Sequence, residues 1–329
     1  MHCPTLKDLP EPPSSKTGWP WAEESGPLPP STPRGQAWPR ITVVTPSFNQ
    51  GRFLEETIRS ILLQGYPDLE YIVMDGGSTD GSVEIIKKYS PWITTWVSEP
   101  DGGQSAAINR GLGMGSGLFA TWINSDDLLC QNAIVNHATH VGFDANTVYV
   151  GFCGYIDTDG KPISLHRGRV LSLEDLVRIR TVWRSEGHKA SIDQPAVLFP
   201  RALALSVGGL NADNHYTMDY ELWGKFFLAG ARFQYTDVPF GMFRQHEEQK
   251  THDGLRQTRS LIASAATLTE LATCFSEPKK KELLSDLNDY FVQYKKIHWR
   301  QSGRLARIGL PPYIVNPVRA IRAVLQKAF

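Results

Sequence analysis

The feature that most constrains the fold is an alternation of short apolar runs with amphipathic stretches between residues 41 and 123. The runs are rich in Val, Ile and aromatic residues and have the length of strands, and the stretches between them repeat their apolar residues at helical spacing. Strands that alternate with helices predict an α/β fold, with a mostly parallel sheet flanked by helices. The predicted strands span 41–45, 70–74, 93–97 and 118–123, and the predicted helices span 52–64, 82–89 and 104–112.

A polar cluster follows each of these four strands. Ligands of parallel sheets bind beyond the carboxyl ends of the strands, and these ends lie at the same edge of the sheet. We therefore expect one site that is built from four strand ends. The clusters are Pro46-Ser47-Phe48-Asn49, Asp75-Gly76-Gly77-Ser78, Glu99-Pro100-Asp101-Gly102 and Asn124-Ser125-Asp126-Asp127.

Composition divides the chain into three parts. Residues 1–39 are rich in Pro, Ser and Gly, which predicts an N-terminal tail, although its three tryptophans indicate that part of it lies against the folded body. Residues 40–255 form the predicted body. Residues 256–329 contain two helical stretches and form a predicted C-terminal helical appendage with a basic tail.

The basic tail has two interpretations that the residues leave open. The last 35 residues carry eight Lys or Arg and no acid, with apolar residues interleaved at helical spacing around Val318 and Leu325. This pattern is typical of a helix that lies on an anionic membrane surface. A helix that docks on the protein body fits the same pattern.

Charge and cysteine content narrow the classes of function. The 34 Lys and Arg residues balance 34 Asp and Glu residues, so the formal net charge is +0 and lacks the basic excess of a nucleic-acid-binding protein. The four cysteines are scattered without the spacing of metal ligands, which favours reduced thiols. No run has the length of a membrane span, and the N-terminus lacks the order of a signal peptide. We expect a cytoplasmic protein, peripheral on the inner membrane face if its basic tail binds lipid, that does not bind nucleic acid.

Two motifs need an explicit choice between interpretations. Residues 111–117 suggest a dinucleotide-binding fingerprint, but they have the spacing GxGxGxG and follow a helix, so we interpret them as a helix end and a flexible loop. Asp126 and Asp127 are adjacent carboxylates after an apolar strand, as in sites where Mg²⁺ or Mn²⁺ binds a phosphorylated substrate. A turn that caps the next helix explains the same residues, and both explanations stay open at this point.

Five segments, in their order along the chain, resemble the inverting family 2 glycosyltransferases, which have the GT-A fold. The resemblance runs from about Arg40 to His246. Each segment alone is a weak signal, and the order of all five carries the resemblance. The segments are residues 44–49, 75–80, 99–111, 122–127 and 218–223.

The resemblance implies a nucleoside-diphosphate sugar as donor and Mn²⁺ or Mg²⁺ as cofactor. Asp75 would bind the nucleobase, on which Phe48 would pack. His246 belongs to an Arg-x-His element that implies a further metal or phosphate ligand, although a loop histidine without that role fits equally. The implied donor-binding residues are Pro46, Phe48, Asp75, Gln104, Asn109, Arg110, Asn124 and Asp126, and the implied metal ligands are Asp127, Asp126 and His246.

The resemblance also implies an acceptor side and a catalytic base. Asp219, at the start of a predicted helix, would remove the proton of the acceptor hydroxyl, and Gln194 and Trp223 would lie on the acceptor side. The acceptor would be a saccharide or a lipid-linked molecule, in the synthesis of polysaccharides or glycoconjugates. Two residues depart from the family pattern, since Asn124 and Ala106 stand where many relatives have Asp.

Two other functions compete with this one. A nucleotidyltransferase normally has a basic, glycine-rich phosphate loop after its first strand, and here residues 46–51 have only Arg52 as a basic neighbour. A non-catalytic module that binds nucleotide sugars would have no need for Asp126, Asp127 and Asp219 together. The sequence therefore favours an enzyme.

Overall fold

The computed structural model describes residues 3–178, 191–250 and 254–289, which belong to two compact units. We call them the sheet unit and the helical unit and describe each by itself. The sheet unit comprises the described residues of Met1–Arg167, Ile192–Ala212 and Ala229–Gln245. The helical unit comprises those of Gly168–Ser191, Asp213–Leu228 and His246–Phe329.

The sheet unit is built on one mixed sheet with the strand order β3-β2-β1-β4-β8-β6-β9-β5, and β7 pairs with β6. The pairs among β1 to β4 and the pair β6–β9 are parallel and contain most of the paired residues. The predicted α/β fold with a mostly parallel sheet is thus confirmed. The strands are β1 (Ile41–Ser47), β2 (Leu69–Asp75), β3 (Thr95–Ser98), β4 (Phe119–Trp122), β5 (Leu128–Leu129), β6 (Thr147–Ile156), β7 (Pro162–His166), β8 (Val197–Pro200) and β9 (Arg232–Arg244).

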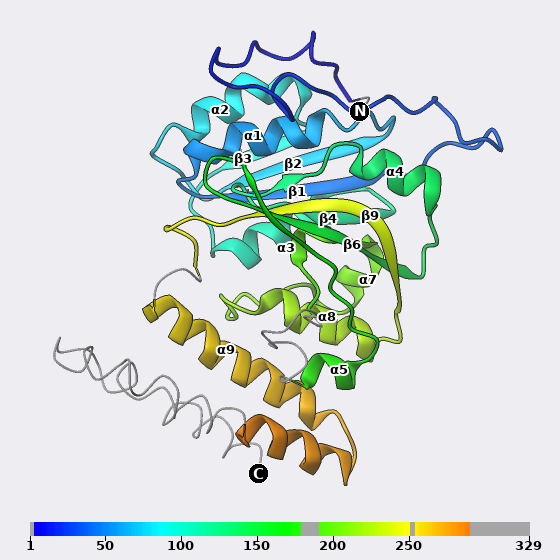
Figure 1. The fold of residues 1–329 in the computed structure, drawn as a ribbon, viewed down its shortest axis with the longest axis vertical. Coiled ribbons are helices and arrows are strands. Elements are labelled where there is room, and N and C mark those ends of the chain that lie inside the picture. The colour runs from blue at the N-terminus through cyan, green and yellow to red at the C-terminus, as the bar shows by residue number, and fades with distance from the viewer. Residues whose placement is uncertain (1–2, 179–190, 251–253, 290–329) are drawn as a thin grey trace, which may run out of the picture. The chain divides into compact units, whose positions relative to one another are not determined.

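Helices cover both faces of this sheet. In Figure 1, α1, α2 and α4 lie on one side, and α3 and α7 lie on the other. Side chains alternate across β1, so that Ile41 and Val43 join the core under α1 while Val44 faces α3. The helices of this unit are α1 (Gly51–Leu62), α2 (Ser82–Tyr89), α3 (Gln104–Met114), α4 (Ala133–His140) and α7 (Arg201–Ser206), with 3₁₀ turns η1 (Ser90–Trp92) and η2 (Gln194–Ala196).

The glycine-rich stretch after residue 110 is a packing surface rather than the expected flexible loop. A Cβ atom on Gly111, within α3, would lie 2.5 Å from Val44 Cγ1. On Gly117 it would lie 2.5 Å from Thr42 Oγ1. Both distances are shorter than atoms tolerate, so these glycines let the helix end approach β1 closely.

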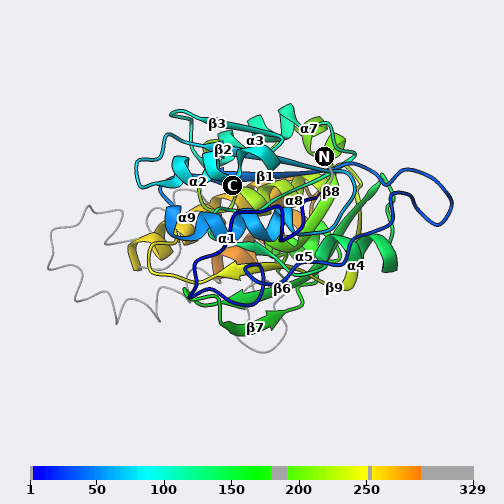
Figure 2. The same ribbon diagram turned by 90° about the horizontal axis from the view of Figure 1, so that it is seen from above.

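Residues 3–39 belong to the sheet unit and run over α1 (Figures 1 and 2). Arg59 of α1 is fully buried and donates hydrogen bonds to the backbone carbonyls of Pro10, Pro20 and Trp21, at 2.9–3.1 Å. The indole of Trp19 donates to the Leu129 carbonyl at 2.9 Å. The segment therefore packs against the unit, as its tryptophans had indicated, and does not extend from it as the predicted tail.

The helical unit contains α5 (Leu173–Val177), α8 (Met218–Leu228), α9 (Gly254–Thr273) and a further helical stretch at 279–289. Arg178 and Lys279 form ion pairs with Glu174 and Glu282 at 2.5–3.0 Å. Across the described residues, no helix is long and apolar enough to cross a membrane. The basic tail lies outside the described residues.

Candidate functional site

The loops that follow β1 and β2 are joined by hydrogen bonds at the carboxyl edge of the sheet. Asn49, in the left-handed region with a φ of 52°, accepts from Thr79 N at 2.9 Å. Its own backbone N–H donates to Ser78 Oγ at 2.8 Å. Gly51 N donates to Asp80 Oδ2 at 2.8 Å, which ties the start of α1 to the second loop. The two predicted loops thus form one surface.

Asp75, the predicted base-binding residue, is held inside its own turn. The residue is 2% exposed, and its carboxylate has several partners. It accepts hydrogen bonds from Gly77 N, from Ser78 N and Oγ, and from Ser98 Oγ, at 2.5–3.1 Å. These bonds fix the shape of the loop, and Ser98 is a partner that the sequence did not reveal.

Phe48 is a large exposed hydrophobic side chain on this surface, with 61% of its area exposed. A Cβ atom on Gly76 would lie 3.3 Å from Phe48 Cδ2 and 3.3 Å from both carboxylate oxygens of Asp101. The Phe48 ring and the Asp101 carboxylate therefore both lie close to Gly76, and little space is left there for a side chain. Pro46, which lies in β1 two residues before Phe48, is buried.

Asn109 and Arg110, two other predicted donor-binding residues, have partners within the sheet unit. The Asn109 amide donates to Leu210 O at 2.7 Å and accepts from Leu210 N at 2.9 Å. Arg110 forms an exposed ion pair with Glu99 at 2.5 Å. Asn109 therefore anchors the loop around Leu210, while Arg110 stays at the surface.

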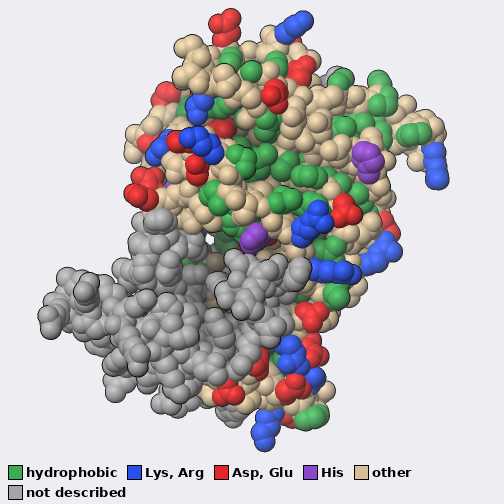
Figure 3. Space-filling model, in the orientation of Figure 1, with side chains coloured by type: hydrophobic (Ala, Val, Ile, Leu, Met, Phe, Trp, Pro, Cys, Tyr) green, Lys and Arg blue, Asp and Glu red, His purple; other side chains and the backbone are tan. Residues whose placement is uncertain are grey.

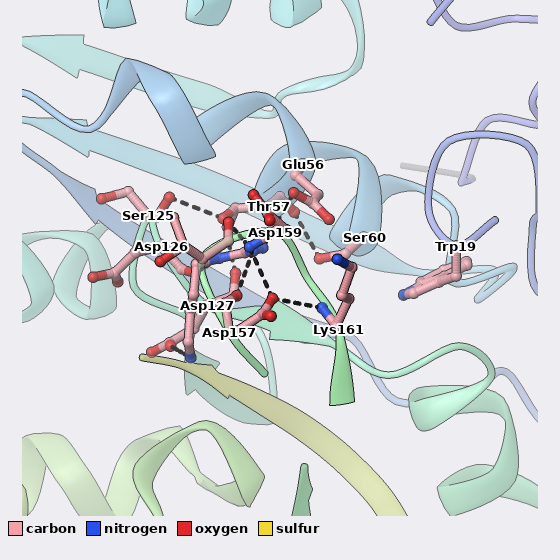
Figure 4. Close-up of polar contacts among 12 residues, drawn as sticks. Trp19, Glu56, Thr57, Ser60, Ser125, Asp126, Asp127, Asp157, Asp159 and Lys161 are labelled. Atoms are coloured by element: carbon pink, nitrogen blue, oxygen red, sulfur yellow. Dashed lines mark hydrogen bonds and ion pairs between the residues drawn. The ribbon is translucent and has the colours of Figure 1, made fainter. Parts of the chain in front are cut away.

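The acidic turn, residues 124–127, follows β4 and is the most closely held part of the site (Figure 4). Asp127 is 1% exposed, and its Oδ1 accepts from Arg244 N at 2.9 Å while its Oδ2 accepts from Asn124 Nδ2 at 3.0 Å. Thr57 Oγ1 of α1 donates to the carbonyls of Ser125 and Asp127 at 3.0 and 2.8 Å. Burial, and then the charge of Asp126, raise the pKa of Asp127 well above its ordinary value.

Arg244, at the end of β9, joins the acidic turn to the β6–β7 hairpin. Its side chain is fully buried, and its Nε donates to Asp126 O at 2.9 Å. Its Nη1 donates to the carbonyls of Asp157 and Thr158 at 3.2 Å. Its Nη2 lies 3.1 Å from Glu56 Oε2 of α1. The sequence had singled out this element for its histidine, whereas the arginine organises the turn.

The Asn124 amide, within the acidic turn, contacts two further amide side chains, those of Gln194 and Gln104. Gln194 Nε2 donates to Trp122 O at 2.6 Å, and Asn124 Nδ2 lies 3.2 Å from Gln194 Oε1. Gln104 Nε2 donates to Asn124 Oδ1 at 2.7 Å. Gln194, which the resemblance places on the acceptor side, thus lies beside the predicted metal-binding residues.

The predicted base lies in the helical unit. Asp219 is half-buried in the first turn of α8 and accepts from Tyr220 N at 2.9 Å. Glu221, two residues later, is buried and is held by Asn214 Nδ2 at 2.9 Å and by Lys225 at 3.1 Å. The two acids therefore have different surroundings, and Glu221 is part of the packing of this unit.

Two further predicted residues also belong to the helical unit. Trp223 is fully buried on α8. His246 is 5% exposed, and its backbone N–H donates to Gln249 Oε1 at 3.0 Å. The structure thus distributes the predicted residues over both units. The acidic turn and the residues predicted to bind the nucleobase lie in the sheet unit, and the predicted catalytic base lies in the helical unit.

The acidic turn has the chemistry of a site for Mg²⁺ or Mn²⁺. Within the described residues, no three His, Cys, Asp or Glu side chains converge as a metal site. Mg²⁺ commonly takes only one or two protein carboxylates beside waters and substrate phosphates, and carboxylate oxygens also suit Mn²⁺. Two adjacent carboxylates, one of them buried, disfavour each other's ionised form unless a cation lies nearby. The residues therefore fit such an ion.

The visible surface shows no large field of one charge. On the face drawn in Figure 3, Lys and Arg side chains are interspersed with Asp and Glu. Nucleic-acid-binding proteins gather basic residues on one face or stripe. The described residues on this face do not show that pattern.

Comparison with known proteins places these features in a family. A profile of the glycosyl transferase family 2 matches residues 42–198. An uncharacterized glycosyltransferase of Rickettsia typhi is 27% identical over 276 residues, which are 82% of this chain and 84% of the relative. The glycosyltransferase GlyG of Streptococcus pneumoniae is 29% identical over 164 residues, which are 49% of this chain and 54% of the relative.

The fold has relatives among solved structures. TarS of S. aureus, residues 1–349, superposes with a TM-score of 0.57 at 16% identity, over 79% of this chain and 74% of that chain. The same protein has been solved in complex with UDP-GlcNAc, with a TM-score of 0.57 at 15% identity, over 78% of this chain and 73% of that chain. This likeness shows a common fold.

Proposed function

Because this chain belongs to glycosyl transferase family 2 and is a glycosyltransferase, we propose that it moves a sugar from a nucleoside-diphosphate donor to an acceptor hydroxyl with inversion and depends on a divalent metal ion. The observation that carries the proposal is the acidic turn. Its Asp127 carboxylate is buried, fixed at both oxygens and adjacent to a second carboxylate.

The donor would bind along the carboxyl edge of the sheet. The exposed ring of Phe48 offers a face on which a nucleobase can stack. Asp126 and Asp127 would hold Mn²⁺ or Mg²⁺, which as a Lewis acid would stabilise the charge of the departing diphosphate. Arg244 would keep the turn in place, because its guanidinium and its backbone N–H contact both aspartates.

Asp219 would act as the general base of the proposed reaction. A base must lie within hydrogen-bond reach of the proton that it removes, so its carboxylate must be accessible to the acceptor. Asp219 is half-buried at a helix start, whereas Glu221 is buried in a local network. An acceptor hydroxyl deprotonated by one carboxylate would attack the anomeric carbon from the face opposite the diphosphate, which inverts the configuration.

The remaining parts of the proposal concern partners and location. The complex of S. aureus TarS with UDP-GlcNAc supports a nucleotide sugar as the donor class on this fold. We propose a saccharide or lipid-linked acceptor, a role in polysaccharide or glycoconjugate synthesis, and a cytoplasmic location with the basic tail at the inner membrane face.

A donor screen tests the proposal. UDP-, GDP- and dTDP-sugars would be titrated by calorimetry with Mn²⁺, with Mg²⁺ and with EDTA, and the donors that bind would be tested for hydrolysis. We expect metal-dependent binding and slow release of a nucleoside diphosphate. Binding without hydrolysis would indicate a non-catalytic module, and release of pyrophosphate from a nucleoside triphosphate would indicate a nucleotidyltransferase.

A further inference from the structure

The orientation of the Gln194 side chain follows from a single contact. The terminal group that lies 2.6 Å from Trp122 O must be the NH₂ group, because a carbonyl oxygen only accepts hydrogen bonds. The other terminal atom of Gln194 is therefore the oxygen, and it faces the Asn124 amide at 3.2 Å. Gln194 thus presents an acceptor to Asn124.

The orientation of Asn124 follows in turn. Its Nδ2 donates both of its hydrogens, one to Gln194 Oε1 and the other to Asp127 Oδ2 at 3.0 Å. The contact with Asp127 Oδ2 agrees with this orientation, because an amide N–H donates and a carboxylate oxygen accepts. The Asn124 oxygen is left on the other side, where Gln104 Nε2 donates to it at 2.7 Å.

We propose that Asn124 is a positioning residue and not a metal ligand, and that Gln194 acts through Asn124 and not on the acceptor. The side of the Asn124 amide that faces Asp127 is its donor side, and turning it to offer its oxygen would break all three hydrogen bonds. Its N–H holds Asp127 Oδ2 in place for the cation. The inference rests on the proposed function, since it names how this chain prepares the same metal site.

The proposal predicts an order of Mn²⁺ affinities among Asn124 variants that differs from the order expected if Asn124 were a metal ligand. In Asn124→Asp, a carboxylate would face Asp127 Oδ2 and Gln194 Oε1 without any donor between these acceptors. In Asn124→Ala, the donor is lost but no repulsion is added. If Asn124 is a positioning donor, wild type should bind Mn²⁺ most tightly, Asn124→Ala more weakly and Asn124→Asp most weakly. A metal ligand would give Asp at or above wild type, with Ala last.

Mn²⁺ affinity measures this order directly. Free Mn²⁺ would be followed by electron paramagnetic resonance, for the ion alone and with UDP present. We expect Asn124→Ala to bind Mn²⁺ about 10-fold more weakly and Asn124→Asp about 100-fold more weakly, as for residues that orient ligands. An Asn124→Asp variant that binds Mn²⁺ as tightly as wild type would overturn the proposal.

A metal-free measurement keeps this result separate from the proposed function. In EDTA, the melting temperatures should follow the same order, because the repulsion in Asn124→Asp needs no cation. Wild-type protein that binds no Mn²⁺ would contradict the metal dependence, and the order of melting temperatures would still test the orientation. Equal melting temperatures of the Ala and Asp variants would overturn it.

Gln194→Met tests the second half of the proposal, with Gln64→Met as the matched control. Gln64 is also a buried amide, and its side chain has three hydrogen bonds, with Ser60 O, Cys130 O and Ile134 N. Gln194→Met should weaken Mn²⁺ binding about 10-fold and leave the KM for the acceptor unchanged. Gln64→Met should lower only the melting temperature. A changed acceptor KM in Gln194→Met, or equal Mn²⁺ loss in both variants, would contradict the proposal.

Discussion

The two acids that are central to the proposed reaction have opposite surroundings. Asp127, in the sheet unit, is 1% exposed, and each of its carboxylate oxygens accepts a hydrogen bond from a different segment of the chain. Asp219, in the helical unit, is half-buried at the start of α8 and accepts a bond from the next backbone N–H. A carboxylate that holds an ion must be positioned in advance, whereas one that takes a proton must be accessible. The surroundings therefore separate the two proposed roles.

The largest expected effect is that of Asp219→Asn on sugar transfer. The amide keeps the shape and the helix start but cannot accept the proton, so the rate should fall about 100- to 10,000-fold while nucleotide binding is retained. Release of nucleoside diphosphate and transfer to acceptor would be measured beside calorimetry of the nucleotide.

Glu221→Gln is the matched control for the base. Its partners Asn214 and Lys225 place it in the packing of the helical unit, so we expect reduced stability and retained transfer. If Glu221→Gln lost transfer and Asp219→Asn kept it, the assignment of the base would be wrong.

Glu56→Gln should produce the largest loss of stability in the sheet unit. The side chains of Arg244 and Glu56 are 0% and 10% exposed and lie 3.1 Å apart. Removing one partner of a buried pair leaves the other charge without compensation, so the free energy of unfolding should fall by about 3 kcal/mol. Denaturation with urea would measure the loss.

An exposed pair gives the control for this prediction. The side chains of Arg110 and Glu99 are 47% and 54% exposed at a distance of 2.5 Å. Solvent screens such a pair, so Glu99→Gln should change the free energy of unfolding by less than about 1 kcal/mol. Equal losses in the two variants would show that Arg244 does not depend on its partner.

Asp127→Asn should weaken metal-dependent nucleotide binding. Loss of an outer partner of a metal site costs about 10- to 100-fold in affinity, and loss of a direct ligand should cost at least as much. Calorimetry with UDP would be run with Mn²⁺ and with EDTA, and the difference between wild type and variant should vanish in EDTA.

Asp157→Asn is the corresponding control. This carboxylate belongs to the β6–β7 turn and accepts from the N–H groups of Asp159 and Lys161 at 2.9 Å. We expect its substitution to leave the Mn²⁺-dependent affinity unchanged. A similar loss in both variants would indicate a general effect of negative charge in place of a ligand.

The local patterns of the sequence predicted the strands and the acidic turn. The predicted strand at 41–45 and the observed β1 begin at the same residue, and Asp126 and Asp127 follow β4 as expected. These features depend on neighbouring residues, whose periodicity is visible in one chain.

The partners of the acidic turn could not be predicted in this way. Thr57 and Arg244 lie 70 and 117 residues from Asp127 along the chain. Neither lies in a local pattern that marks it as a partner, because only the folded sheet brings α1 and the end of β9 to the turn. The packing of residues 3–39 was predicted only in part, from the tryptophans, because Arg59, its main anchor, lies on α1 and looks like an ordinary surface residue of an amphipathic helix.

The smallest expected effect is that of Thr57→Val, which tests how far the sheet-unit carboxylate depends on the backbone around it. Valine keeps the shape of threonine but loses the hydroxyl that donates to Ser125 O and Asp127 O. The free energy of unfolding should fall by about 1 kcal/mol, the usual contribution of one hydrogen bond. Mn²⁺-dependent nucleotide binding should weaken less than in Asp127→Asn, because Thr57 holds the backbone and not the carboxylate. Thr57→Ser keeps the hydroxyl and loses the methyl group, so a Thr57→Ser variant that lost as much binding as Thr57→Val would assign the effect to packing rather than to the hydrogen bond.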